Sequence, residues 1–399
     1  MNHGSFGACP RVVLDEQIAL RARLERQPVA FFRDLEGLLD DVRRSLSPLL
    51  GADADDLAFV PNASTGVGCV IRSLRFSPGD EILITDHIYN SCRNVLALAE
   101  LQGARTVVAS VPFPLESPAQ VTEAILAKAT PRTKLALIDH VTSATGLVFP
   151  IAAIVEALQA RGIDVLVDGA HAPGMVPLDL NRLGAAYYTG NFHKWLCTPK
   201  GSAILHVRRD KQRRPLTGAA PRDPGALELP AILPWTISHG LNSARTDRSR
   251  FRLLWDHVGT VDATPWLCVP AALRFLSGLF PGGLPELQRR NRALALEGQR
   301  LLCDALGVAR PAPEEMIGSL ASVPLPDRPA HETAQPGQFY DPLQQRLLDK
   351  HQTEVPVFSW PAPNKRLVRI AAQAYVARSE IEKLAAALQQ ELILDSKKQ

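Results

Sequence analysis

A lysine set among aromatic and apolar residues is the first residue of this chain that could do chemistry. It stands in the run Tyr187-Tyr188-Thr189-Gly190-Asn191-Phe192-His193-Lys194-Trp195-Leu196. Burial disfavours the ammonium form of a lysine, so a buried lysine has a lowered pKa and can act as an amine nucleophile that forms a Schiff base. The alternative is a surface lysine whose aliphatic stem packs beside Trp195 while its ammonium group reaches water. Lys194 alone does not distinguish the two.

An acidic residue follows the preceding predicted strand, in the sequence Asp168-Gly169-Ala170-His171. An aspartate at a strand end can keep a heteroaromatic nitrogen protonated, which makes the ring an electron sink. An aspartate of this kind and a Schiff-base lysine on the next loop are what pyridoxal phosphate requires. His171 could position the carboxylate or a ring hydroxyl. Asp168 could instead be a turn residue and His171 a satisfied core histidine, but their occurrence together with Lys194 favours the cofactor site.

A candidate phosphate site lies earlier, where a short predicted strand turns into a helix at Pro61-Asn62-Ala63-Ser64-Thr65-Gly66. Hydroxyl side chains and free amides at a helix N-terminus bind anions, although Ser64 or Thr65 could simply cap the helix. The nearby Gly66-Val67-Gly68 has Ile71 where the dinucleotide fingerprint needs glycine, and no Walker-type loop occurs. A nicotinamide-dependent oxidoreductase is therefore disfavoured.

Seven apolar segments alternate with predicted amphipathic helices and must position these residues. The predicted strands are 57–60, 81–85, 106–111, 134–139, 163–167, 185–189 and 202–207. This alternation indicates an α/β fold with a mostly parallel, seven-stranded sheet covered on both faces. In such sheets the ligand lies beyond the carboxyl ends of the strands. Four polar clusters fall there: Asp86-His87, His140-Val141-Thr142-Ser143, Asp168 to His171, and Asn191 to Lys194.

The length of the chain, 399 residues, predicts two domains. We expect a large cofactor-binding domain over 12–262 and a smaller α+β C-terminal domain over 263–399, joined by the N-terminal segment 1–11. Residues 208–249 are expected to form an excursion against a partner subunit, and residues 326–342 a loop beside the cleft.

Composition excludes several classes of protein. The formal net charge is only +3, which argues against a nucleic-acid binder, and no apolar run is long enough to span a membrane. The six cysteines are scattered without zinc-ligand spacing, so no metal site is predicted, and a reducing cytoplasm is expected.

The chain resembles the class V aminotransferase-fold enzymes that use pyridoxal phosphate, and within them the isopenicillin N epimerase-like group. The matching motifs occur in family order over nearly the whole chain. They are Asn2-His3-Gly4-Ser5-Phe6-Gly7, Asn62-Ala63-Ser64-Thr65-Gly66, Thr85-Asp86-His87-x-Tyr89, His140-Val141-Thr142-Ser143, Asp168-Gly169-Ala170-His171, His193-Lys194-Trp195-Leu196, Gly259-Thr260-x-Asp262 and Val368-Arg369-Ile370. The resemblance implies the fold type I architecture of these transferases.

The resemblance also implies roles for individual residues. Lys194 would be the Schiff-base lysine and the base at the substrate α-carbon, Asp168 the partner of the pyridine nitrogen, and Arg369 the clamp on the substrate carboxylate. Ser64, Thr65 and His193 would lie on the phosphate side of the cofactor, and Asn191 would also contact it. His171, Thr142 and Ser143 would lie near the ring, His87 or Tyr89 on the ring face opposite Lys194, and His3 and Ser5 beside the substrate. Thr260 would reach the cofactor of the partner subunit in a homodimer.

The reaction itself is left open by these motifs. The family's desulfurases carry a nucleophilic cysteine ahead of the carboxylate arginine, whereas no cysteine occurs between Pro311 and Arg369. We therefore expect an epimerase or racemase with Tyr89 as the second acid, and the alternatives are a β-eliminating C–S lyase, an aminotransferase and a non-catalytic scaffold of the same fold.

Overall fold

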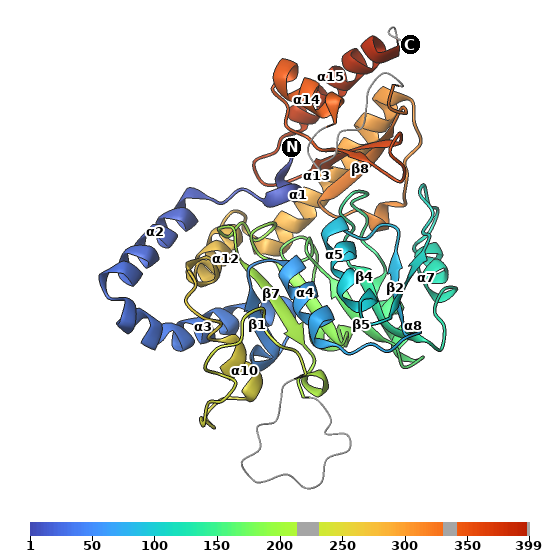
Figure 1. Cartoon of the computed structure of the whole chain (residues 1–399). Coiled ribbons are helices and arrows are strands. Elements are labelled where there is room, and N and C mark those ends of the chain that lie inside the picture. The colour runs from blue at the N-terminus through green and yellow to red at the C-terminus, as the bar shows by residue number, and fades with distance from the viewer. Residues whose placement is uncertain (214–230, 330–340, 397–399) are drawn as a thin grey trace.

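The computed structural model describes residues 1–213, 231–329 and 341–396 (Figure 1). Parts of the two predicted loops, within 208–249 and 326–342, therefore lie outside the described residues. Within the described part, no helix is both long and apolar enough to cross a membrane.

The large sheet has seven strands in the order β1-β7-β6-β5-β4-β2-β3. Their bounds are β1 Leu57–Val60, β2 Glu81–Thr85, β3 Arg105–Ala109, β4 Thr133–Asp139, β5 Asp164–Asp168, β6 Tyr187–Asn191 and β7 Ala203–Val207. The pairs from β3 through β6 are parallel, and β7 runs antiparallel to both β6 and β1. The predicted mostly parallel, seven-stranded sheet is confirmed.

Alternation along each strand directs side chains to two hydrophobic clusters, one on either face of the sheet. In β1, Leu57 and Phe59 join the larger cluster, while Ala58 and Val60 join the smaller one. The covering helices include α3 Pro28–Leu50, α7 Pro118–Leu126 and α8 Ile151–Gln159 against the larger cluster, and α4 Ala63–Ser73, α5 Asn90–Val95, α6 Ala97–Glu100 and α10 Arg250–Trp255 against the smaller one.

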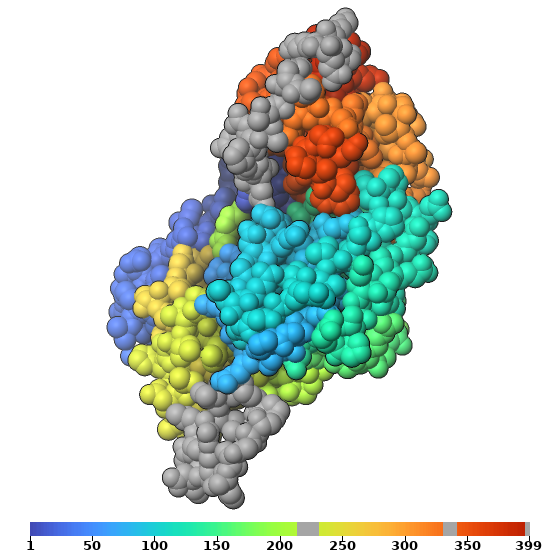
Figure 2. Space-filling model, turned by 45° about the vertical axis from the view of Figure 1, so that its right-hand side comes forward, coloured from blue at the N-terminus to red at the C-terminus, as the bar shows by residue number. Residues whose placement is uncertain are grey.

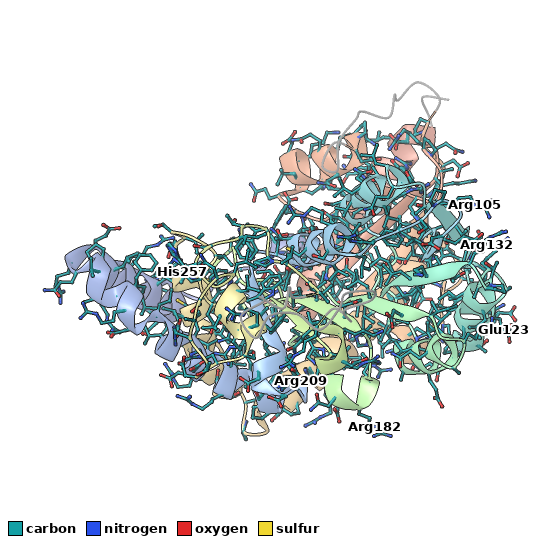
Figure 3. The ribbon with its side chains drawn as sticks, turned by 60° about the horizontal axis from the view of Figure 1, so that its bottom comes forward. Arg105, Glu123, Arg132, Arg182, Arg209 and His257 are labelled. Atoms are coloured by element: carbon teal, nitrogen blue, oxygen red, sulfur yellow. The ribbon has the colours of Figure 1, made fainter. Side chains whose placement is uncertain are left out.

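The amino end of β2 is held by charge. Glu81 is buried at this end and accepts hydrogen bonds from Arg105, Arg132 and the Thr130 hydroxyl. Figure 3 shows the two arginines side by side at one edge of the molecule. A buried carboxylate with three donors is satisfied, so these contacts stabilise the amino end of the sheet. The predicted site lies at the opposite, carboxyl end.

A second sheet, antiparallel and of three strands, lies in the C-terminal part. Its order is β8-β10-β9, from Leu320–Leu325, Arg366–Ala371 and Val357–Ser359. The long helix α13 Gly283–Leu306 packs on it, α15 Arg378–Ser396 packs on α13, and α14 Pro342–His351 packs on α15. Figure 2 shows this part, in orange and red, stacked above the large sheet region.

The remaining helices connect the two parts. The helix α2 Arg11–Arg26 leads into α3 after a break at Gln27, and Pro28 begins α3. The short helices α11 Thr264–Leu267 and α12 Val269–Ser277 pack against α2 and α3, and α9 Leu180–Leu183 precedes β6. The first helix, α1 His3–Phe6, lies between the large sheet and the C-terminal part (Figure 1). The division at residue 262 stays a prediction.

Candidate active site

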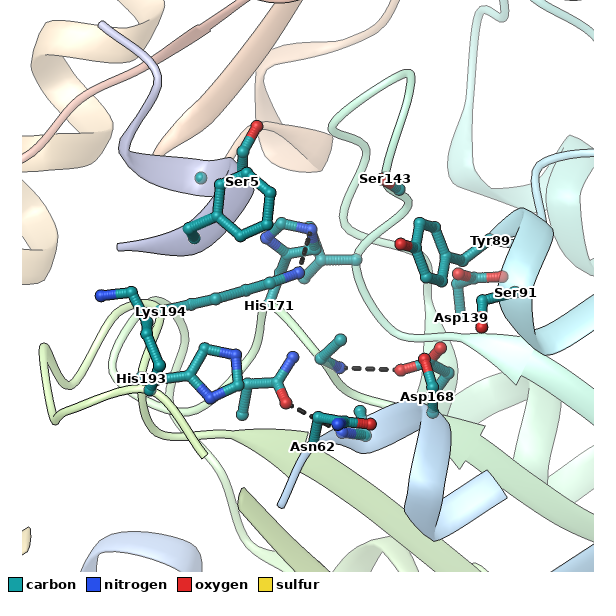
Figure 4. A pocket seen from close by; sticks show the side chains of 18 of the residues that line it. Ser5, Asn62, Tyr89, Ser91, Asp139, Ser143, Asp168, His171, His193 and Lys194 are labelled. Atoms are coloured by element: carbon teal, nitrogen blue, oxygen red, sulfur yellow. Dashed lines mark hydrogen bonds between the residues drawn. The ribbon is translucent and has the colours of Figure 1, made fainter. Parts of the chain in front are cut away.

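A cavity of about 490 Å³ opens at the carboxyl ends of β4, β5 and β6, where α1 and the C-terminal sheet close over the large sheet (Figure 4). Its polar residues lie close together because the parallel strands that carry many of them end at one edge of the sheet. Residues that line it are Gly4, Ser5, Phe6, Pro61, Asn62, Ala63, Ser64, Tyr89, Ser91, Asp139, Val141, Ser143, Asp168, Ala170, His171, Asn191, His193, Lys194, Lys200, Gly201, Pro356, Phe358 and Arg369.

Lys194 lies on the turn that follows β6, with its amine in the cavity wall. Its Nζ is 3.1 Å from Nε2 of His171. Burial, together with the positive charge of Arg369, lowers the pKa of Lys194 to about 8, although the acids Asp168 and Asp139 oppose the shift. At pH 7 a pKa of about 8 leaves roughly a tenth of Lys194 as the free amine, far more than an exposed lysine has, and the free amine is the state that a nucleophile or base requires.

Two buried carboxylates form the floor of the cavity. Asp139 and Asp168 end the adjacent parallel strands β4 and β5 and are register partners. Asp168 accepts hydrogen bonds from the Ala170 amide at 2.9 Å and from the Cys92 thiol at 3.1 Å. Burial and the nearby Asp168 raise the pKa of Asp139 well above its ordinary value, so Asp139 retains its proton where an exposed aspartate would be ionised.

No motif in the sequence pointed to Asp139 or to Cys92. Asp139 was recognisable only as the last residue of a predicted strand adjacent to the Asp168 strand. Cys92 comes from α5 on a different connection, and no spacing rule connects it to Asp168.

The N-terminus of α4 forms one end of the cavity. Asn62 caps this helix, because its Oδ1 accepts hydrogen bonds from the Thr65 amide at 2.9 Å and the Thr65 hydroxyl at 3.1 Å. Ser64 and His193 reach the cavity, and His193 is held by the Ser202 carbonyl at 3.0 Å. This helix end and its polar neighbours suit a phosphate, because unpaired amides and the helix dipole favour negative charge.

Two of the predicted cofactor-binding residues, Thr65 and Asn191, already have hydrogen-bond partners within the protein. The Thr65 hydroxyl donates a hydrogen bond to Asn62, and Thr65 is not among the residues that line the cavity. Asn191 does line the cavity, but its Oδ1 accepts a hydrogen bond from the Ala63 amide at 2.8 Å. Lys200, to which no sequence motif pointed, adds a cation to the lining of the cavity.

Arg369 supplies a buried cation at the other end, on β10. Its guanidinium group lies 4.8 Å from the Phe358 ring centre and donates to the Ser143 carbonyl, and to Ser5 Oγ at 3.3 Å. Its Nε has no hydrogen-bond partner among the described residues. Burial lowers the pKa of Arg369, which means that the site penalises the positive charge until an anion enters. A carboxylate suits this position because the arginine fork can bind both of its oxygens.

His87 and Thr142 lie behind the cavity wall instead of lining it. His87 Nδ1 is 2.8 Å from Thr145 Oγ1, its Nε2 is 3.3 Å from the Val111 carbonyl, and its ring packs 4.5 Å from that of Trp360. Thr142 is buried and bonded to the same Thr145 hydroxyl at 2.7 Å. Of the alternatives proposed for the ring face, the structure brings Tyr89 to the cavity and not His87, and Ser143 but not Thr142 is exposed to it.

His3 and Thr260 also lie off the cavity. His3 is buried, with Nδ1 2.9 Å from the Tyr375 hydroxyl and Nε2 3.0 Å from the Lys194 carbonyl, so it contacts the backbone of the lysine turn. Ser5 of the same helix does line the cavity. Thr260 is exposed on the surface of the single chain described here.

Together these groups fit pyridoxal phosphate. An amine of lowered pKa, a buried acid pair and a helix N-terminus stand around one cavity, which also holds a buried arginine whose Nε has no partner in the described part of the chain. Lys194 would hold the cofactor covalently, Asp168 would face its ring nitrogen, and the end of α4 would face its phosphate. The fold and the site thus define a pyridoxal-phosphate enzyme of fold type I.

Comparison with known proteins agrees with the assignment of this fold and cofactor. The profile of the family named Aminotransferase class-V matches residues 12–221, and the chain belongs to this family. It is 34% identical to isopenicillin N epimerase of Streptomyces clavuligerus, over 97% of this chain and 93% of that protein. It is 32% identical to putative L-cysteine desulfhydrase 1 of Oryza sativa subsp. japonica, over 82% and 67%.

A solved structure shares the fold. It is a mutant of C-DES with glycine covalently linked to its PLP cofactor, and it superposes with a TM-score of 0.74 at 23% identity, covering 97% of this chain and 95% of that one. Membership of the class V family, together with the site, identifies the protein as an enzyme whose cofactor is pyridoxal phosphate, as the sequence predicted.

Proposed function

We propose that this enzyme is an epimerase or racemase of isopenicillin N epimerase type, which inverts the α-carbon of an amino acid or an amino-acid-derived substrate. The observation that carries the proposal is the placement of Lys194 and Tyr89, which enter the cavity from opposite sides (Figure 4). Inversion needs one group to remove the α-proton and another to return a proton from the opposite face. The 34% identity to an isopenicillin N epimerase over nearly the whole chain supports the same reaction.

Each cavity residue then has a definite task. Bound pyridoxal phosphate supplies an electron sink that acidifies the substrate α-proton. Arg369 holds the substrate carboxylate and so orients the α-carbon, while Lys194, free to act as a base because its pKa is lowered to about 8, takes the proton. The Tyr89 hydroxyl donates a proton from the other side. Asp168 stabilises a positive charge on the ring nitrogen at the cavity floor.

A β-eliminating lyase is the second candidate, because a putative L-cysteine desulfhydrase is 32% identical to this chain. It would use the same Lys194 and Arg369, with a proton delivered to a leaving thiolate. A sulfur relay on a cavity cysteine is not supported, since no cysteine is among the described residues that line the cavity.

The reactions separate in deuterated water. The purified enzyme is incubated with single amino acids and with peptide-linked amino-acid substrates, and three products are followed: deuterium at an inverted α-carbon, a released keto acid, and cofactor converted to its amine form. Inversion with deuterium uptake supports the epimerase. Keto-acid release without inversion would show that the enzyme is a lyase. Accumulation of the amine form of the cofactor would show that it is an aminotransferase.

Tyr89→Phe provides the sharper test. We expect inversion to fall by about 10²–10⁴-fold, the usual contribution of a general acid, while deuterium exchange with retention continues through Lys194. Lys194→Ala is the matched control and should abolish both reactions together with the visible absorption of lysine-bound cofactor. If Tyr89→Phe reduced exchange and inversion equally, Tyr89 would be a ring contact and not the second acid.

A further inference from the structure

The side chain of Trp195 turns from the lysine turn toward His171, and it is one of the largest fully buried side chains of the protein. Its indole Nε1 donates a hydrogen bond to Nδ1 of His171 at 3.3 Å. On its other side, the ring of Trp195 lies 5.0 Å from the ring of His3. Gly174 lies against the backbone of the same residue, because a Cβ at Gly174 would come within 2.8 Å of the Trp195 carbonyl. Among the described residues, His171 is the hydrogen-bond partner of the buried indole N–H.

This contact determines where the proton of His171 lies. An indole N–H can only donate, so Nδ1 of His171 must be the unprotonated, accepting nitrogen. A neutral imidazole carries one proton, which then belongs to Nε2, and an imidazolium, with protons on both nitrogens, would place two donors against each other. Burial and the nearby Lys194 also lower the pKa of His171 well below its ordinary value, in agreement with a neutral ring.

The position of the His171 proton affects the protonation of Lys194. Nε2 of His171 is 3.1 Å from Nζ of Lys194. If Nε2 carries the proton, it donates, and the lysine nitrogen must accept, which only the free amine can do. The hydrogen-bond chain from Trp195 through His171 thus disfavours the ammonium form of Lys194, in the same direction as burial does.

We propose that Trp195 is a positioning residue that sets the tautomer of His171, so that Nε2–H is always directed into the cofactor cavity beside Lys194. The proposal concerns the cofactor site and does not depend on which reaction follows. With cofactor bound, the same Nε2–H is a fixed donor to an acceptor in the space next to Lys194, and it cannot exchange roles with Nδ1.

The test uses nitrogen NMR of the full-length, cofactor-free protein with ¹⁵N-labelled histidine, and His171→Gln identifies the signals of His171. In the wild type we expect a protonated Nε2 and an unprotonated Nδ1. Trp195→Phe keeps an aromatic ring but removes the donor, and the ratio of the Nε2–H to the Nδ1–H tautomer should fall by about three- to tenfold, which corresponds to the loss of one hydrogen bond. The pKa of Lys194, followed by the pH dependence of cofactor incorporation, should rise in this variant.

Trp255→Phe is the matched control. Trp255 is also buried, its Nε1 has no partner among the described residues, and it lies in the hydrophobic cluster away from His171. It should leave both the His171 signals and cofactor incorporation unchanged. A protonated Nδ1 in the wild type would overturn the proposal without any variant, and so would a folded Trp195→Phe protein whose His171 signals match those of the wild type. Should that variant fail to fold, the wild-type spectrum decides.

Discussion

At the scale of single residues, burial shifts the pKa values of charged groups around the cavity toward their neutral forms. Two cations, Lys194 and Arg369, are both held at lowered pKa by burial, and the acid Asp139 is held at a raised one. A site of this kind is costly until a ligand brings the missing charges. A phosphate, a ring nitrogen and a carboxylate would each meet a complementary group.

The raised pKa of Asp139 makes stability depend on pH. In the unfolded chain Asp139 ionises near its ordinary value of 3.8, whereas the folded protein keeps it protonated to higher pH. The folded state therefore binds more protons in this window, and its stability falls as pH rises from about 4 toward the folded pKa. Asp139→Asn cannot ionise and should escape this loss.

We accordingly expect the unfolding free energy of cofactor-free Asp139→Asn, relative to the wild type, to increase between pH 4 and pH 7. Urea unfolding at a series of pH values measures it. The exposed Asp34→Asn serves as the control and should show no such trend. A difference that is constant over this range would mean that Asp139 is ionised in the folded protein.

At the scale of elements, the N-terminal helix α1 is held against the lysine turn at close range. Gly7 has φ of 75°, and a Cβ there would come within 2.1 Å of the His193 carbonyl. His3 binds the Lys194 carbonyl from the same segment, and Ser5 contacts Arg369. This short segment therefore helps to shape both ends of the active site, the amine and the carboxylate clamp.

Gly7→Ala should force α1 away from this turn. We expect a loss of about 1–3 kcal/mol in stability, from the strained φ and the clash, and a raised KM as the Ser5–Arg369 contact opens. Gly37→Ala is the control, because Gly37 lies in α3 with nothing within 4 Å of its added Cβ, and it should stabilise by about 0.5–1 kcal/mol. Thermal unfolding and steady-state kinetics measure both. An unchanged KM in a stable Gly7→Ala enzyme would contradict this role for α1.

At the scale of the whole molecule, the helices α2 and α3 leave apolar side chains in solvent. Ile18 is 65% exposed and Val29 75% exposed, on the arm at the left of Figure 1. On the same side of the molecule, Arg43 and Asp256 form a buried ion pair that fastens the end of α10 just before the segment leading to Thr260. The family resemblance predicts that a homodimer completes the site, and these exposed apolar side chains are available to pack in its interface.

We expect a solution mass of twice the 43.4 kDa chain by light scattering. Thr260→Ala should remain dimeric but bind the cofactor more weakly. Thr122→Ala, on α7, is the control, and it should keep both the dimer and the cofactor affinity of the wild type. Mixing Lys194→Ala with Thr260→Ala under exchange conditions should regenerate one intact site per mixed dimer, and therefore activity. A monomeric protein, or no regeneration in a mixed dimer, would show that Thr260 does not serve the partner subunit.

Strand periodicity in the sequence determined the α/β fold and the placement of Asp168 and Lys194 at one site, because parallel strands end at one edge and chain order alone brings their strand-end residues together. The order of the family motifs determined the cofactor and predicted that Arg369, on the separate antiparallel sheet, would join them.

Only the tertiary structure decided which neighbours of those residues face the cavity. Tyr89 reaches it while His87, two residues earlier, is buried against Trp360, a residue far along the chain, and Asp139 and Cys92 join Asp168 across separate connections. The orientation of Trp195 toward His171 is of the same kind. Such choices depend on packing between segments distant in sequence, and a local pattern carries no information about them.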